Sequence, residues 1–206
     1  MLTLHLDGPH TRILSGLCQA CPQGNPGCCR APPAYDWSDL GRLVLQNQRD
    51  FLLTAIAARN LLPNGSGLLI RRVRRRESAT DRRQPKCIFH CPTGCTLPHT
   101  ARPGTCNYFV CEDVYRTDLA QANAAIVASV RQAASRLASA YQAVNVQLGE
   151  RLRNDFPDGP PWGTELLDWL GANFEARLPE FSTLATTTTS GKSQERTLPP
   201  PDPSHR

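Results

Sequence analysis

Cysteine is concentrated in two short segments of this chain, and that distribution limits how the chain can fold. Residues 87–111, CIFHCPTGCTLPHTARPGTCNYFVC, hold five of the nine cysteines, and the other four lie between residues 18 and 29. No cysteine follows Cys111, whereas cysteines that serve as small buried core residues would be spread along the chain. Both segments are rich in Gly and Pro and poor in apolar residues, so we expect bound metal to order them.

The spacing of the thiols is typical of metal ligands. Cys18 and Cys21 form a Cys-x2-Cys turn, which places two thiolates on one side of the chain. Cys28 and Cys29 are adjacent; in an extended backbone they would point to opposite sides and serve two centres, unless the chain turns sharply. Eight thiolates would complete two four-coordinate sites and leave one cysteine over. Free or redox-active thiols are the alternative interpretation.

The bulk composition predicts a cytoplasmic protein of one domain. The 206 residues are 40% hydrophobic, which suits a single core. The first residues do not resemble a signal peptide, and no run approaches the roughly 20 apolar residues that a membrane span needs. The cytoplasm keeps thiols reduced, and nine is an odd number, so a disulfide framework is not expected.

The apolar periodicity predicts about three helices. The first would span residues 36–62 with Asp36 or Ser38 as its N-cap, the second about 114–154, and the third about 164–178. Residues 68–70, with Val73, are read as a short strand after a turn at 63–65. The predicted fold class is therefore mainly α, with irregular cysteine-rich loops packed on the helices and little or no β structure. We expect one domain over residues 1–181 and a disordered, low-complexity tail over 182–206.

The ordered set of motifs resembles the YkgJ-type cysteine-cluster family, which is described as zinc- or iron-chelating CxxCxxCC domains. The matching features are CxxC, the CC pair, C-x-F at 87–89, GC at 94–95, RPxxC at 102–106 and the final aromatic-x-Cys at 109–111. The resemblance covers about residues 18–115. It implies a metal site whose ligands are Cys18, Cys21, Cys28, Cys29, Cys87, Cys95, Cys106 and Cys111.

The chain departs from the family pattern at several positions. Cys91 is additional to the eight cysteines, the gap between Cys21 and Cys28 is wide, and the segment before Arg102 is longer by a residue. Cys91 or His99 would then be an additional or substitute ligand, with His90 a more distant candidate. Both zinc and iron remain open as the metal. The Cys-Pro steps at 21–22 and 91–92 slightly favour an iron–sulfur cluster.

Arginine is concentrated between the two cysteine segments. Residues 71–86 contain eight basic and two acidic residues, whereas the net charge of the whole chain is +5. Arg71, Arg72, Arg74, Arg75 and Arg76 are the candidate polyanion-binding residues. No aromatic residues alternate with them, so we do not expect specific binding of nucleic acid. Arg102 lies between two cysteines, where it would offset the charge of a thiolate site as an outer-shell group.

We therefore predict a metal-binding protein that coordinates zinc or iron through clustered thiolates. Two alternatives stay open: a subunit of an iron–sulfur redox or modification enzyme, and an adaptor that binds polyanions through residues 71–86. No catalytic motif beyond the metal site and no nucleotide-binding motif is evident, so whether the protein is an enzyme is undecided. A redox partner or a metal-donor protein is the expected type of partner.

Overall fold

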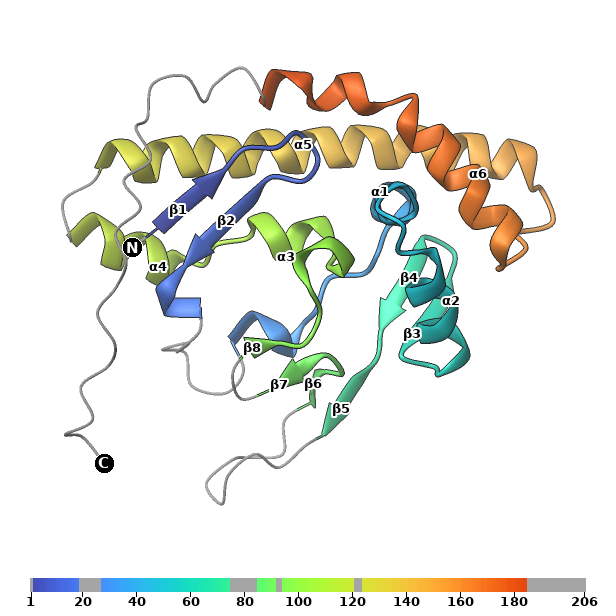
Figure 1. Cartoon of the computed structure of the whole chain (residues 1–206), viewed down its shortest axis with the longest axis horizontal. Helices are drawn as coiled ribbons and strands as arrows, with labels where there is room; N and C mark the ends of the chain where they lie inside the picture. Colours follow the sequence, from blue (N-terminus) through green and yellow to red (C-terminus); the bar gives the residue numbers. More distant parts are fainter. Residues whose placement is uncertain (1, 19–26, 75–84, 92–93, 121–123, 185–206) are drawn as a thin grey trace.

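The computed structural model describes residues 2–18, 27–74, 85–91, 94–120 and 124–184 (Figure 1). The helices are α1 (Trp37–Leu45), α2 (Arg49–Ala57), α3 (Gly104–Tyr108), α4 (Glu112–Ala120), α5 (Ala124–Asp155) and α6 (Thr164–Glu175). The strands are β1 (Leu2–His5), β2 (Arg12–Ser15), β3 (Leu61–Asn64), β4 (Gly67–Ile70), β5 (Arg72–Arg74), β6 (Pro85–Cys87), β7 (His90–Cys91) and β8 (Gly94–Cys95). Short 3₁₀ turns are η1 (Gly16–Cys18), η2 (Gly27–Arg30), η3 (His99–Ala101) and η4 (Leu178–Leu184).

The main core lies between α1, α5 and α6. Leu40 and Leu43 of α1, Leu148 of α5 and Phe174 of α6 are almost fully buried in one cluster. In Figure 1 the long α5 runs the length of the molecule, α6 lies alongside it, and α1 packs beneath them. This apolar stripe on α5 follows the spacing that the sequence predicts for residues 114–154. The helices therefore form a frame on which the shorter segments are carried.

The close approach of α1 to α6 depends on Gly41. A Cβ atom at this position would lie 2.5 Å from the Cβ of Phe174 and 2.7 Å from the carbonyl oxygen of Leu170. We expect Gly41→Ala to lower the free energy of unfolding by about 1–3 kcal/mol, because the two helices must separate. Chemical denaturation would measure this change. Gly65→Ala, where nothing lies within 4 Å of the added atom, is the control, and an equal loss there would contradict the packing argument.

The predicted single helix over residues 36–62 is wrong, because the chain turns between α1 and α2. Asp36 does cap the first helix: its side chain accepts a hydrogen bond from the Asp39 amide. Asn47 then takes a left-handed conformation with φ 57°, and the Gln48 amide donates to the Leu43 carbonyl at 2.9 Å. This is a Schellman C-cap, which satisfies the last carbonyls of α1 and stops the helix.

The second helix ends in the same way, five residues before the predicted stop. Arg59 is left-handed with φ 54°, and the Asn60 amide donates to the Ala55 carbonyl at 2.8 Å. In both caps the left-handed residue is not Gly, so the apolar periodicity of the sequence does not reveal where either helix ends. The helix periodicity of 36–62 thus describes two helices joined at an angle.

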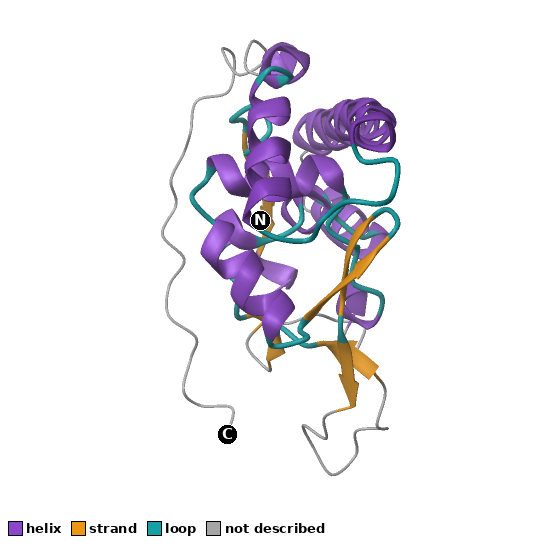
Figure 2. Cartoon of the chain, turned by 90° about the vertical axis from the view of Figure 1, so that its right-hand side faces the viewer, coloured by secondary structure: helices purple, strands orange, loops and turns teal. Residues whose placement is uncertain are grey.

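The expectation of little or no β structure is also wrong. The described residues form four antiparallel two-stranded sheets, which pair β1 with β2, β3 with β4, β5 with β6, and β7 with β8. The predicted strand at 68–70 is confirmed as part of β4, and the turn signal at 63–65 falls in the hairpin that leads to it. The other pairs contain two to four residues per strand, too few for an alternating pattern to stand out in the sequence. In Figure 2 one strand pair runs down the right of the view, and further strands lie at the bottom, beneath the stacked helices.

A second, smaller hydrophobic cluster joins the N-terminal hairpin to the helical frame. Its buried members are Leu2, Ile13, Val110, Val114, Tyr115, Val127 and Val130. It connects β1 and β2 with α4 and α5, which together replace the single helix expected at 114–154. The third predicted helix is α6, and η4 continues to Leu184, past the predicted start of the tail. The remainder of that tail lies outside the described residues.

None of the helices in the described part of the chain is both long enough and apolar enough to cross a membrane.

Candidate metal centre

Five cysteines from three separate segments interact electrostatically, and we call them the thiol cluster. The cluster consists of Cys28, Cys29, Cys87, Cys95 and Cys106. Cys28 and Cys29 lie in η2, Cys87 and Cys95 end β6 and β8, and Cys106 lies in α3. In Figure 1 α3 lies at the centre of the molecule with β6 and β8 below it, and β6 packs directly against η2. The fold thus brings together members of both cysteine segments.

The 3₁₀ turn η2 places the two adjacent cysteines on the same side. The Ala31 amide donates to the Cys28 carbonyl at 3.2 Å, so the chain turns sharply at the pair. The Cys29 thiol donates a hydrogen bond to the Cys28 sulfur, and this bond lowers the pKa of Cys28 to about 6. The same bond and burial raise the pKa of Cys29. Cys28 is therefore the member of the pair suited to act as a thiolate, with Cys29 as its donor.

Cys87 lies at the end of β6 with its sulfur held by backbone donors. The amides of Phe89 and His90, two and three residues further on, both donate to this sulfur. Such N–H···S bonds stabilise a thiolate and fix its direction, as outer-shell bonds do around metal-bound cysteine. Burial has the opposite effect and raises the pKa of Cys87, which is only 8% exposed. The side chain is thus oriented for ligation while the free thiol stays protonated.

The β7–β8 ribbon separates Cys95 from Cys91. Its register pairs His90 with Cys95 and Cys91 with Gly94. Paired residues share a face and successive residues alternate, so Cys91 lies on the face opposite to Cys95. Gly94 has φ 122°, a conformation that residues with a side chain rarely adopt. This geometry supports the interpretation that Cys91 is the surplus cysteine.

Cys106 lies in α3, one turn after the Arg-Pro-Gly of the RPxxC motif. The thiol is exposed on one side, but the surrounding protein, the Asp39 carboxylate and three other thiols all raise its pKa. Asp39 is buried in α1, 4% exposed, and accepts a hydrogen bond from the Gly104 amide at 2.6 Å. The segment that carries Cys106 is therefore anchored to the helical core.

Arg42 completes this anchor, and sequence reasoning missed both residues. Its guanidinium is 1% exposed, lies 3.2 Å from the Asp39 carboxylate, and donates to the Arg102 carbonyl. It also donates to Gln46 at 2.9 Å, and the Gln46 amide contacts His10 Nδ1 at 2.8 Å. The i, i+3 spacing of Asp39 and Arg42 in α1 was the available sequence signal for this ion pair. The same spacing is common in exposed ion pairs, so it does not indicate burial. The contact with Gln46 joins His10 to the anchor.

The other predicted ligands are placed elsewhere or lie outside the described residues. Cys111 packs on the second hydrophobic cluster, as does Leu17, the neighbour of Cys18. Cys21 and the side chain of Cys18 are outside the described part. His99 lies in η3, where partial loss of solvent contact and then the charges of Arg12, Arg102 and Arg42 lower its pKa.

Among the side chains that the structure describes, no three or more His, Cys, Asp or Glu residues are grouped closely enough to hold a metal ion. None of the seven cysteines described with their side chains forms a disulfide bond. The cluster is thus defined by electrostatic interaction, which acts over longer distances than ligation does. To bind an ion, its thiols would have to draw together.

The arginines that the sequence analysis singled out differ in their contacts and in their exposure to solvent. Arg102 Nε donates to the Leu97 carbonyl at 2.9 Å, which fastens the loop before the RPxxC motif. Arg71 donates to Asn60 at 3.0 Å, whereas Arg72 and Arg74 are exposed on β5. Arg75 and Arg76 lie outside the described residues. The structure therefore gives Arg71 and Arg102 structural contacts and leaves two arginines facing solvent.

The chemistry of the thiol cluster favours a cation. Cys29, Cys87 and Cys106 all have raised pKa values, to which burial and the neighbouring thiols contribute. A soft metal ion reverses this balance, because it lowers the pKa of each coordinating thiol and removes the repulsion between thiolates. The donor set therefore fits zinc, iron or an iron–sulfur cluster.

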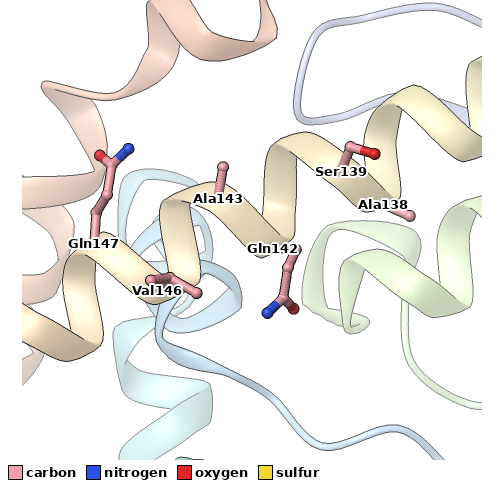
Figure 3. Close-up of a pocket in the computed structure, with 6 residues that line it drawn as sticks. All are labelled: Ala138, Ser139, Gln142, Ala143, Val146 and Gln147. Carbon is pink, nitrogen blue, oxygen red and sulfur yellow. The ribbon is translucent and has the colours of Figure 1, made fainter.

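A hollow on the outer face of α5 offers no comparable chemistry. Figure 3 shows its lining, which comes from α5 alone: Ala138, Ser139, Gln142, Ala143, Val146 and Gln147. None of these side chains titrates or binds metal ions well. The thiol cluster is thus the better candidate for the functional site.

Comparison of the chain with protein-family models, with curated proteins and with solved structures gave no match.

Proposed function

We propose that this protein binds zinc or iron, the latter as an ion or as an iron–sulfur cluster, through the thiols of the thiol cluster. The observation that carries the proposal is that cysteines of η2, of the β6–β8 segment and of α3 lie close enough to interact electrostatically. Cys28, Cys87, Cys95 and Cys106 are the proposed ligands, and the Cys29 thiol donates to Cys28. The bound metal would supply a structural cross-link or a redox centre, depending on its identity.

The resemblance to the YkgJ-type family supports the same assignment and extends it. The family pattern adds Cys18, Cys21 and Cys111 to the ligands, which would allow a second centre near the second hydrophobic cluster. Because the thiols must stay reduced to bind metal, the proposal places the protein in a reducing compartment such as the cytoplasm. A metal-donor or redox protein is the partner that this chemistry requires.

Elemental analysis and a visible spectrum of protein purified without oxygen test the proposal. Iron with acid-labile sulfide and a brown colour would identify a cluster and favour the alternative of a redox or modification enzyme subunit. Colourless protein with one or two zinc ions per chain would identify a thiolate site with a structural or metal-handling role. Protein that contains no metal and takes up neither zinc nor iron on reconstitution would refute the proposal.

A second candidate function is the binding of a polyanion along β5. The register pairs Arg72 with Cys87 and Arg74 with Pro85, so both exposed arginines share the sheet face that carries Cys87. Arg30, also exposed, directly follows Cys29. Cationic side chains thus border the thiol cluster, which suits an anionic ligand or an acidic partner.

We expect the double substitution Arg72→Glu/Arg74→Glu to weaken binding to heparin, used as a model polyanion, and to reduce its salt dependence. The elution salt from a heparin column and a binding titration at two ionic strengths would measure both effects. The control is Arg49→Glu/Arg131→Glu, which changes the charge equally at exposed sites on α2 and α5. If both double variants elute alike, the retention reflects net charge and β5 is not a binding face.

A further inference from the structure

Asp39 and Arg42, which anchor the RPxxC segment, are charged residues that lie inside the protein. Asp39 and Arg42 are 4% and 1% exposed, and ionised groups are rarely so buried unless they are paired. They lie on α1 beside the main core, and the residue that follows each of them, Leu40 and Leu43, is fully buried in it. A pair of apolar residues would satisfy the packing of a helix at this place. The packing of α1 therefore does not explain why a charged pair occupies these two positions.

The hydrogen bonds of the pair identify what it holds. Asp39 accepts from the Gly104 amide at 2.6 Å, and Arg42 donates to the carbonyl oxygen of Arg102. These two backbone groups lie two and four residues before Cys106, and Pro103 stands between them. One buried ion pair thus binds both a donor and an acceptor of the same short segment, which fixes its position and its direction.

The other side of the segment is fixed by close packing. A Cβ atom on Gly104 would lie 2.8 Å from the ring of Tyr141, so only glycine lets the segment rest on that ring. Tyr141 is held in turn by its hydroxyl, which donates to the Pro9 carbonyl at 2.6 Å. Tyr108, at the end of α3, stacks on the same ring with the centroids 5.9 Å apart. Cys106 therefore extends from a segment that is held on two sides.

We propose that Asp39 and Arg42 are positioning residues for the metal centre, and that they hold Cys106 toward Cys28, Cys87 and Cys95. This inference rests on the proposed metal binding. Cys106 is the only cluster member carried by α3, so its direction depends on how the 102–106 segment is seated. In the anchored protein the 102–106 segment is already ordered before metal binds. Without the anchor this segment would lose its conformational entropy on metal binding, and the affinity would fall.

The test compares metal affinity with folding. Zinc affinity of the purified full chain would be measured by competition with a chromogenic chelator, for the wild type, Asp39→Ala and Asp39→Asn. Amide hydrogen exchange of the peptide covering residues 102–108 would be followed in the metal-free proteins. Leu148→Ala is the matched control, because it removes a buried side chain of the same core two helical turns along α5 from Tyr141.

We expect Asp39→Ala to lower zinc affinity about 10- to 100-fold, the range found when an outer-shell partner is removed, and to speed exchange in 102–108. Asp39→Asn keeps a side-chain oxygen that can accept from Gly104, so it should recover part of the affinity. Leu148→Ala should lower stability and leave the affinity of the folded protein within about 3-fold of the wild type, which is less than the 10-fold loss that marks an outer-shell partner.

Other outcomes would overturn the inference in distinguishable ways. Equal zinc affinity of the wild type and of a folded Asp39 variant would refute the positioning role and leave the metal proposal intact. An affinity loss in Leu148→Ala as large as that in the Asp39 variants would show that the effect is general destabilisation. A wild type that binds no zinc or iron would refute the metal proposal and, with it, this inference. If Asp39→Ala does not fold, Asp39→Asn and its exchange pattern decide.

Discussion

Replacement of Arg42 by methionine is expected to lower the free energy of unfolding by about 3–5 kcal/mol, the cost of leaving a buried charge without its partner. Methionine fills a similar volume, so the loss comes from the Asp39 carboxylate and from the Arg102 carbonyl, both of which lose a donor. Asp39 keeps the Gly104 amide, but a single neutral donor does not replace a guanidinium. Urea denaturation of the purified chain, followed by circular dichroism, would measure the change.

Two comparisons separate the charge effect from lost packing. The exposed pair of Arg49 and Asp168, with side chains 43% and 52% exposed, is expected to contribute less than about 1 kcal/mol, so Arg49→Met should have little effect. The double variant Asp39→Asn/Arg42→Met has no lone buried charge and should be more stable than Arg42→Met alone. If the double variant is as unstable as the single one, the pair acts through packing rather than charge.

Replacement of Cys106 by serine is expected to weaken metal binding about 100- to 1,000-fold. A four-thiolate zinc site contributes about 10–16 kcal/mol, and one ligand in four represents about 2.5–4 kcal/mol of that. Serine has nearly the same shape but does not ionise at neutral pH, so it removes the ligand and little else. Chelator competition would measure the affinity, and elemental analysis of the purified variant would show the loss of bound metal.

Cys91→Ser is the matched control within the same segment. The register of β7 and β8 places Cys91 on the face opposite to Cys95, so we expect its replacement to leave most of the metal bound. The two variants lose the same atom from the same kind of residue and differ only in where the sulfur lies. Loss of all metal in Cys91→Ser, with Cys106→Ser unaffected, would mean that the ligand assignment is reversed.

The fold consists of a helical frame and of the loops that carry the thiol cluster, and the buried pair of Asp39 and Arg42 connects the two. The helices α1, α5 and α6 bury the apolar residues and could support many different loops. What distinguishes this chain is that a polar pair at the centre of the frame reaches the backbone of the loop that carries Cys106. A substitution at Asp39 or Arg42 would therefore change the position of the Cys106 thiol, even though neither residue is a proposed metal ligand.

The helical periodicity of the sequence was informative where a segment has one long apolar stripe. Most of the stripe over 114–154 lies in α5, with its start in the separate α4, and the shorter stripe over 164–178 corresponds to α6, because i, i+3 and i+4 spacing is a local property of a helix. It failed at 36–62, where two left-handed residues, Asn47 and Arg59, end helices that the apolar pattern would continue. Asn is a recognised C-cap residue, but Arg is not, so the second end had no sequence signal.

The cysteine spacing alone led to the prediction of metal chemistry, because clustered thiols at ligand spacing indicate a metal site whatever the fold. Only the tertiary structure decided which thiols interact: η2 packs against β6, which brings Cys28 within electrostatic range of Cys87, and the ribbon places Cys91 on the face opposite to Cys95. It also decided that Asp39 and Arg42 are buried under the 102–106 segment rather than paired on the surface. Ligand spacing is local, whereas burial and contacts between segments depend on how distant parts of the chain pack, and no single segment of the sequence contains that information.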